Sequence, residues 1–293
     1  MTTPPNTKTF TPGRPIWCAG CGDFAVQGVL EKSLNKMGIP PHKLMLLAGI
    51  GCSGTIQNNL RCYGYHALHG RVLPATIGAK LANPDLTVIA AGGDGDGFAI
   101  GVGHLVHTFK SNPSIMYIVM NNSNYGLTKG QASPTSPIGY HDNSETGLDS
   151  ILLGLSFLST TFLARGFSGN PEQLGQLMEA AIEHTESGKG FAFLEVLSPC
   201  VTYYDTHREW RAKVYNVDED ESFDPTNRSA AFQKVIELKE QGHIPIGRIF
   251  KGEHPSLESI IINKEETLPA QQNISHFDDH RKHYDQFIKA HLG

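Results

Sequence analysis

Residues 86–97 read Leu-Thr-Val-Ile-Ala-Ala-Gly-Gly-Asp-Gly-Asp-Gly, and this stretch decides the fold of the chain. Its first six residues form a largely apolar run, which is typical of a strand buried on both faces of a sheet. A helical pattern follows over 98–109, and a second buried-strand run, 115–120, ends at Asn121 and Asn122. Strand, glycine turn, helix and strand together predict a βαβ unit with a right-handed crossover.

The glycine turn at residues 92–97 combines features that favour a phosphate with two carboxylates that repel one. Glycines allow a ligand to approach the backbone closely, and the start of a helix adds a partial positive charge. Asp94 and Asp96 lie in the same turn, and a Mg²⁺ ion that bridges a carboxylate to phosphate oxygens removes the repulsion. Asn122 follows the neighbouring strand, and ligands of open α/β sheets lie at the carboxyl ends of strands. The sequence therefore predicts a Mg-diphosphate site with Asn122 as a neutral ligand.

Two commoner phosphate motifs do not match this turn. The dinucleotide fingerprint requires Gly-x-Gly-x-x-Gly, whereas the turn has glycine at 93, 95 and 97 with aspartates between them. No Gly-Lys-Ser/Thr follows, which argues against a nucleoside-triphosphate loop. The alternative without a ligand is a buried βαβ unit that has a tight turn for structural reasons alone.

The composition bounds the class of protein. A chain of 293 residues suits one large domain, or one domain with an extension, and its 31 glycines fit an α/β protein with many tight turns. The net charge of −5 gives no reason to expect binding to nucleic acid or to an anionic membrane. No apolar run is long enough to span a bilayer. Because residues 1–14 are polar and lack the apolar core of a secretory signal, we expect a cytoplasmic protein.

The chain has five cysteines, Cys18, Cys21, Cys52, Cys62 and Cys200. Without a secretory signal, metal binding or redox use is favoured over disulfides. The first three lie in glycine-flanked turns, and Cys200 follows a predicted strand, so these four predict a Cys₄ site that holds either zinc or an iron–sulfur cluster. The turn of Cys52 can face the cofactor crevice, which favours the cluster. A thioredoxin-like pair at Cys18 and Cys21, or buried structural thiols, are the alternatives, and Cys62 is interpreted as a core thiol.

Six motifs occur in order along the first 200 residues. They are Trp-Cys-x-Gly-Cys-Gly (17–22), Gly-Ile-Gly-Cys-Ser (49–53), Leu-His-Gly-Arg (68–71), Gly-Asp-Gly-Asp-Gly (93–97), Asn-Tyr-Gly-Leu-Thr-Lys-Gly-Gln-x-Ser-Pro-Thr (124–135) and Ser-Pro-Cys (198–200). Together they resemble the β subunit of 2-oxoacid:ferredoxin oxidoreductases, and most closely the two-subunit 2-oxoglutarate type. The resemblance implies a three-layer α/β thiamine-diphosphate-binding fold with a mainly parallel sheet and a C-terminal arm.

The same resemblance implies three cofactors and their ligands. A [4Fe–4S] cluster is assigned to Cys18, Cys21, Cys52 and Cys200. Mg²⁺ is assigned to Asp94, Asn122 and the backbone carbonyl of Asn124. The positions around thiamine diphosphate are Ile50, Gly51, Cys52, Ser53, His69, Gly95, Asp96, Gly126 and Leu127. The candidate catalytic residues are His69 and Lys129, and the loop of Lys129 faces substrate in relatives.

The reaction implied by the resemblance is the oxidative decarboxylation of a 2-oxoacid, with 2-oxoglutarate giving succinyl-CoA and CO₂. Electrons pass through the cluster to ferredoxin, and coenzyme A takes the acyl group. The implied partner is an α subunit in an (αβ)₂ heterotetramer. The alternatives are a pyruvate or other 2-oxoacid enzyme, a non-redox thiamine-diphosphate lyase or transferase with a structural zinc site, and a zinc-stabilised binding subunit. Thr55 stands where some relatives carry lysine, so that position does not indicate the substrate.

The chain changes character after about residue 205. An acidic run at 218–221 precedes one predicted helix over 229–241 and several polar segments marked by proline. We therefore expect a thiamine-diphosphate-binding domain with the Cys₄ site over 1–205. Residues 206–293 are expected to form an extension that wraps on a partner subunit.

Overall fold

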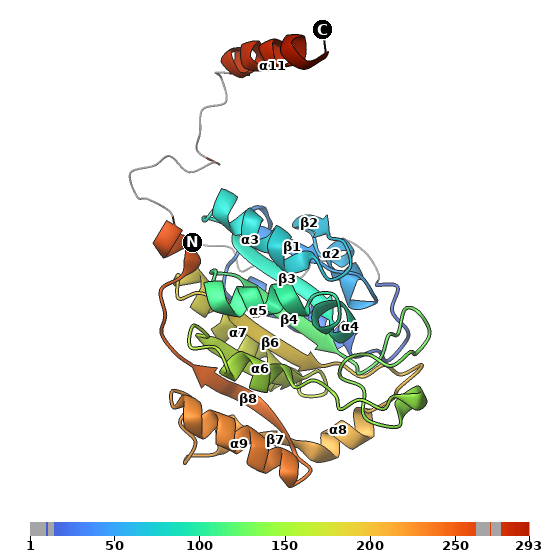
Figure 1. Cartoon of the computed structure of the whole chain (residues 1–293). Coiled ribbons are helices and arrows are strands. Elements are labelled where there is room, and N and C mark those ends of the chain that lie inside the picture. Colours follow the sequence, from blue (N-terminus) through green and yellow to red (C-terminus); the bar gives the residue numbers. More distant parts are fainter. Residues whose placement is uncertain (1–9, 11–14, 262–269, 271–276, 293) are drawn as a thin grey trace, which may run out of the picture.

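The computed structural model describes residues 10, 15–261, 270 and 277–292. Residues 1–14, on which the expectation about a secretory signal depends, lie outside these ranges except for Phe10. The described residues form one eight-stranded sheet in the order β2-β1-β3-β4-β6-β5-β8-β7 (Figure 1). Its strands are β1 (Leu44–Ala48), β2 (Tyr63–His66), β3 (Thr87–Gly93), β4 (Met116–Asn121), β5 (Phe162–Phe167), β6 (Ala192–Leu197), β7 (Val214–Asn216) and β8 (Ile244–Lys251).

Helices connect these strands and cover the sheet (Figure 1). They are α1 (Asp23–Lys36), α2 (Ile56–Asn59), α3 (Val72–Ala82), α4 (Asp94–Phe98), α5 (Val102–Ser111), α6 (Ser150–Leu155), α7 (Pro171–Glu186), α8 (His207–Lys213), α9 (Arg228–Glu240), α10 (Leu257–Ile261) and α11 (Phe277–Leu292). None of the helices in the described part of the chain is long and apolar enough to cross a membrane.

Two hydrophobic cores, one on each face of the sheet, make three layers. Successive side chains of a strand point to opposite faces, and in β4 Ile118 belongs to one core whereas Tyr117 and Val119 belong to the other. The first core is closed by α1 and α7, and the second by α3, α5, α6 and α9. Six strands, from β2 to β5 in the sheet order, pair in parallel. The prediction of a three-layer α/β fold with a mainly parallel sheet is confirmed.

The central βαβ unit has the predicted strands but a divided helix. The helix predicted over 98–109 is instead α4, which begins at Asp94, followed by α5, which begins at Val102. The break lies next to Gly101, where an added Cβ would stand 2.5 Å from the carbonyl oxygen of Asp96. Only glycine allows α5 to start so close to the backbone of α4. The short first helix directs its aspartates toward the carboxyl end of β3.

Residues beyond 205 extend the same sheet. β8 pairs antiparallel with β5, and β7 pairs in parallel with β8. The predicted helix over 229–241 is present as α9, whereas no strand was expected over 244–251. Positive φ at Gly247 and a register shift opposite Leu163 and Ala164 interrupt the regular alternation of β8. The boundary drawn at residue 205 therefore falls within a continuous sheet, and contact of the later residues with a partner stays a prediction.

Candidate functional site

A cavity of about 610 Å³ lies where β1, β3 and β4 end. Its wall contains all nine residues that the family resemblance assigns to thiamine diphosphate and all three that it assigns to Mg²⁺. The full lining is Ile50, Gly51, Cys52, Ser53, His69, Gly93, Asp94, Gly95, Asp96, Asn122, Asn124, Tyr125, Gly126, Leu127, Thr128 and Gln131. Turns far apart in the sequence meet here because parallel strands present their carboxyl ends at one edge of the sheet.

Asp94 is buried at the start of α4, and its two carboxylate oxygens have different surroundings. The hydroxyls of Ser133 and Thr135 donate to Oδ2 at 2.5 and 2.6 Å. Oδ1 accepts only a long bond, 3.4 Å, from the backbone N–H of Asn122. Burial raises the pKa of the Asp94 carboxyl, and the hydroxyl bonds oppose that shift. Oδ1 therefore keeps lone pairs for a cation, which fits the predicted Mg²⁺ site.

Asn122 and Asn124 form a tight turn directly after β4. The Asn122 side-chain oxygen accepts the backbone N–H of Asn124 at 3.1 Å, and the Asn124 amide donates to the Asn122 carbonyl at 3.0 Å. The side-chain oxygen of Asn124 is buried and has no hydrogen-bond partner among the described residues. Because a buried acceptor without a donor is costly, a cation in the cavity would stabilise this arrangement. The predicted ligand was the backbone carbonyl of Asn124, and that choice stays a prediction.

Asp96 joins two turns that contribute to the cavity. Its Oδ1 accepts the backbone N–H groups of Ile50 and Gly70, both at 2.8 Å, and the Nδ1 of His69 lies 3.0 Å away. Because a carboxylate oxygen only accepts hydrogen bonds, Nδ1 of His69 carries the proton in this contact, and in the neutral form of the ring Nε2 would then be an acceptor. Asp96 thus fixes the tautomer of a predicted catalytic residue.

Two glycines of the cavity region have no room for a side chain. A Cβ at Gly49 would overlap the Oδ2 of Asp96, which is buried and has no hydrogen-bond partner in the described part of the protein. A Cβ at Gly95 would overlap the ring of Tyr125. The aromatic ring therefore packs directly on the backbone of the Gly-Asp-Gly turn, a contact that the sequence did not predict.

Lys129 lies in a closed loop beside the cavity rather than in its wall. The N–H of Tyr125 donates to the carbonyl of Gln131 and the N–H of Gly130 donates to the carbonyl of Tyr125, which closes this loop, and Lys129 has a left-handed φ of 79°. Its neighbours Thr128 and Gln131 line the cavity, whereas Lys129 itself is exposed. A non-glycine residue held at positive φ is strained, and such strain concentrates at functional sites. The catalytic role of Lys129 stays a prediction.

Hydrogen bonds hold the cysteine-bearing segments together. The indole N–H of Trp17 donates to the carbonyl of Cys52 at 2.7 Å, and the N–H of Gly22 donates to the carbonyl of Pro199 at 3.1 Å. These bonds bring the Cys18–Cys21 segment against the turn of Cys52 and against the residue before Cys200. Cys52 also lines the cofactor cavity.

The electrostatics indicate that the four thiols are neighbours. Burial raises the pKa of the Cys21 thiol well above its ordinary range and that of Cys52 to about 11. The charge of Cys200 adds to both shifts, and that of Cys18 adds to the shift of Cys52. For Cys62 burial raises the pKa to about 11 with no contribution from another cysteine, as expected for the predicted core thiol.

Four thiols on neighbouring segments suit either a zinc ion or an iron–sulfur cluster. Zinc requires all its sulfur ligands within about 2.3 Å of one metal, and the described residues include no group of three Cys, His, Asp or Glu side chains placed to hold one ion. A cluster binds each thiolate to a different iron and so accepts sulfurs that are near one another without converging on a point. The four thiols are donors of the kind that a [4Fe–4S] cluster requires, and the choice of this cluster over zinc stays a prediction.

Comparison with known families and proteins gives a consistent result. Residues 49–196 match the family described as thiamine pyrophosphate enzyme, C-terminal TPP binding domain. Residues 200–265 match the family described as the C terminal of the pyruvate ferredoxin oxidoreductase beta subunit.

Individual proteins similar to the chain include the 2-oxoacid:ferredoxin oxidoreductase subunit beta of Saccharolobus solfataricus, which is 38% identical over 91% of this chain and 89% of that protein. The 2-oxoglutarate oxidoreductase subunit KorB of Mycobacterium tuberculosis is 32% identical over 83% of this chain and 62% of that protein. Among solved structures, a chain of the 2-oxoglutarate:ferredoxin oxidoreductase from Magnetococcus marinus, with 2-oxoglutarate, coenzyme A and succinyl-CoA bound, superposes with a TM-score of 0.82. It is 31% identical, and the match covers 94% of this chain and 95% of that one.

Proposed function

The chain belongs to the β subunits of the 2-oxoacid:ferredoxin oxidoreductases, which are thiamine-diphosphate enzymes, and we propose that its substrate is 2-oxoglutarate. The products are then succinyl-CoA and CO₂, and the electrons leave through a [4Fe–4S] cluster to ferredoxin. The observation that carries the electron-transfer part of this proposal is the position of Cys52 in the wall of the cavity that also contains Asp94 and Asn122. A candidate electron acceptor thus adjoins the candidate diphosphate site.

Each part of the cavity has a proposed role. Asp94, Asn122 and Asn124 hold Mg²⁺, and through it the diphosphate. When bound, thiamine diphosphate supplies an electron sink that lets a 2-oxoacid lose CO₂. His69, oriented by Asp96, presents an acceptor nitrogen. Lys129 provides a positive charge next to the cavity for a substrate carboxylate.

The proposed catalytic unit includes an α subunit, as the names of the β-subunit relatives imply, in an (αβ)₂ assembly. The only carboxylates in the cavity wall described by the structure are Asp94 and Asp96, and both are occupied at the predicted diphosphate end. We infer that the acid that activates the aminopyrimidine ring of thiamine diphosphate comes from the α subunit. Leu127 lines the cavity and is 56% exposed, which supports a partner that covers the opening.

Pyruvate is the second candidate substrate, because residues 200–265 match a family described by pyruvate. The solved relative that contains 2-oxoglutarate aligns with nearly the whole chain, which favours 2-oxoglutarate. The purified α–β complex should be assayed for 2-oxoacid-dependent reduction of ferredoxin across pyruvate, 2-oxoglutarate, and branched and aryl 2-oxoacids. We expect kcat/KM for 2-oxoglutarate to exceed that for pyruvate by at least about tenfold, a difference of about 1.4 kcal/mol in transition-state binding. The opposite order would overturn the assignment, and the isolated β chain should show no activity.

A further inference from the structure

A line of buried contacts starts at Asp94 and leads away from the cofactor cavity. Thr135 has one hydroxyl proton and stands between two acceptors, Oδ2 of Asp94 at 2.6 Å and the side-chain oxygen of Asn121 at 2.9 Å. The Asn121 oxygen also accepts the backbone N–H of Ser123 at 2.9 Å. The two acceptors share this proton, so the loop that carries Thr135 contacts both Asp94 and the last residue of β4.

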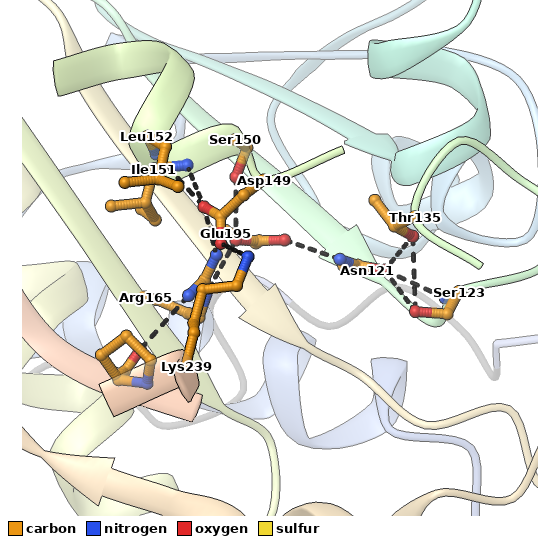
Figure 2. Close-up of polar contacts among 11 residues, drawn as sticks. Asn121, Ser123, Thr135, Asp149, Ser150, Ile151, Leu152, Arg165, Glu195 and Lys239 are labelled. Carbon is orange, nitrogen blue, oxygen red and sulfur yellow. Dashed lines mark hydrogen bonds and ion pairs between the residues drawn. The ribbon is translucent and has the colours of Figure 1, made fainter. Parts of the chain in front are cut away.

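Glu195 determines which way the Asn121 amide faces. The Asn121 Nδ2 donates to Oε1 of Glu195 at 2.6 Å, so its oxygen is turned toward Thr135 and Ser123 (Figure 2). A flipped amide would set its oxygen against the carboxylate and its NH₂ against the Ser123 N–H. Glu195 lies on β6, a central strand that is paired with β4, so this direction is fixed by a rigid element.

A balanced set of charges holds Glu195 in place. The Nε of Arg165 donates to Oε2 of Glu195 at 2.6 Å, and the hydroxyl of Ser150 donates to the same oxygen at 2.8 Å. Arg165 also reaches Asp149 at 3.1 Å, and Lys239 binds the other oxygen of Asp149 at 2.6 Å (Figure 2). These two cations hold the pKa of the Asp149 carboxyl well below its usual range. Two positive and two negative side chains leave the network neutral.

Burying an ion pair costs desolvation energy, so stability alone does not explain why this network is buried. Glu195 is 2% exposed and Arg165 is 5% exposed, and apolar side chains of similar volume at such positions are often as stable. The pair adjoins Asn121, which in turn contacts Thr135, one of the residues that bind the Asp94 carboxylate. Mutation of a residue that orients a metal ligand commonly lowers the affinity for the metal by about 10–100-fold.

We propose that Glu195 is a positioning residue for the metal site, acting through Asn121 and Thr135. The hydroxyl of Thr135, whose one proton is shared with the Asn121 oxygen, binds Oδ2 of Asp94 together with the hydroxyl of Ser133 and so leaves Oδ1 for the cation. Arg165 and Lys239 allow Glu195 to be buried without adding net charge near a diphosphate. This proposal depends on the proposed function, because it takes Asp94 as a ligand of Mg²⁺.

The test is metal affinity in the α–β complex with saturating thiamine diphosphate, measured by electron paramagnetic resonance titration of Mn²⁺ as the probe. Thr135→Val removes the hydroxyl and keeps the shape, and we expect the Mn²⁺ dissociation constant to rise by at least about tenfold. Thr135→Ser should restore most of the affinity. Thr76→Val is the matched control: Thr76 is buried and its hydroxyl bonds only a carbonyl of its own helix.

Two further variants connect the effect to Glu195. Glu195→Gln should weaken Mn²⁺ binding severalfold, and combining it with Thr135→Val should add little, since both act along one line. Asn121→Ala removes the amide between Glu195 and Thr135 but keeps both charges of the Glu195–Arg165 pair. It therefore tests the proposal even if the Glu195→Gln complex does not assemble. Asn121→Ala should likewise weaken Mn²⁺ binding by several-fold.

The outcomes separate the two proposals. If Thr135→Val and Asn121→Ala lower the melting temperature but leave Mn²⁺ affinity within about twofold of the wild type, the network is structural and the positioning role is wrong. If wild-type complex itself binds no Mn²⁺ in the presence of thiamine diphosphate, the proposed cofactor site is wrong instead.

Discussion

The side chains of Cys52 and Asn122 both lie next to Gly126, close to the position that a Cβ atom of this residue would take. The sulfur of Cys52 lies 3.6 Å and the amide nitrogen of Asn122 lies 3.7 Å from a Cβ built there. Cys52 belongs to the turn after β1, and Asn122 directly follows β4. A proposed cluster ligand and a proposed Mg²⁺ ligand are therefore neighbours across one glycine. Electrons leaving the cofactor would need no carrier between the two sites.

The five cysteines should divide into four ligands and one that is dispensable. Serine substitution of Cys18, Cys21, Cys52 or Cys200 is expected to lower the iron content and visible absorption of the anaerobically purified complex, because each thiolate binds a separate iron. Cys62→Ser is the matched control and should keep the wild-type iron content, since no other cysteine contributes to the shift of the Cys62 pKa. Loss of iron in Cys62→Ser with retention in Cys200→Ser would refute the assignment.

Asp94→Asn should weaken Mg²⁺-dependent binding of thiamine diphosphate by more than about tenfold, because it removes the charge that faces the cation. Isothermal titration of the complex with thiamine diphosphate at fixed Mg²⁺ measures this effect. Asp85→Asn makes the same charge change outside the cavity, in the turn before β3, and should bind like the wild type. Equal affinities for the two variants would exclude Asp94 as a ligand.

Gly95→Ala should disturb the cofactor site through Tyr125. The added methyl would overlap the ring, so the ring must move, and with it the closed loop that carries Thr128 and Lys129. We expect lower affinity for thiamine diphosphate, with partial recovery in the double variant with Tyr125→Ala, which removes the ring. Gly103→Ala in α5, where an added Cβ has open space, should retain affinity. The expectation fails if both alanine variants behave alike.

Stability should fall with acid in a way that depends on His184. Burial, with the charges of Lys189 and Lys251 as smaller causes, lowers the pKa of this ring from 6.5 to about 4. Between these values the unfolded chain binds a proton that the folded chain does not, so stability is lost as pH falls from about 6.5 to about 4. The total loss is as much as about 3 kcal/mol.

The measurement for His184 is the melting temperature of the complex at pH 7.5 and 5.5. Wild type should lose more on acidification than His184→Gln, in which the titrating ring is absent. His42→Gln changes an exposed histidine and should retain the wild-type response. Equal losses in wild type and His184→Gln would show that this ring does not titrate as described.

The strands predicted from sequence are those whose burial on both faces produces a continuous run of apolar residues. The apolar runs of β3, β4 and β6 were recognisable because parallel strands are covered on both faces. β2 reads Tyr-Gly-Tyr-His with all four residues exposed, and an edge strand of that kind has no apolar run to find. β8 escaped prediction because Gly247 and the register shift break its alternation.

The site residues that could be predicted are those in short motifs at the ends of strands. Asp94, Asn122 and the glycine turns could be placed together because all follow strands of one sheet. The hydroxyls of Ser133 and Thr135 were missed, although the Ser-Pro-Thr motif contains them, because a loop sequence does not say where it folds back. Glu195 and Arg165 are charged residues inside apolar strands, and only the register of β5 with β6 sets them side by side.

The most direct test of the adjoining cofactor and cluster is reduction of the cluster by substrate in the absence of ferredoxin. The anaerobic α–β complex, loaded with Mg²⁺ and thiamine diphosphate, should develop the paramagnetic signal of a reduced [4Fe–4S] cluster when 2-oxoglutarate and coenzyme A are added. The same mixture with Asp94→Asn or Cys52→Ser should remain without the signal. A colourless complex that contains zinc, or an iron–sulfur complex whose signal never responds to any 2-oxoacid, would contradict the adjacency of the two sites.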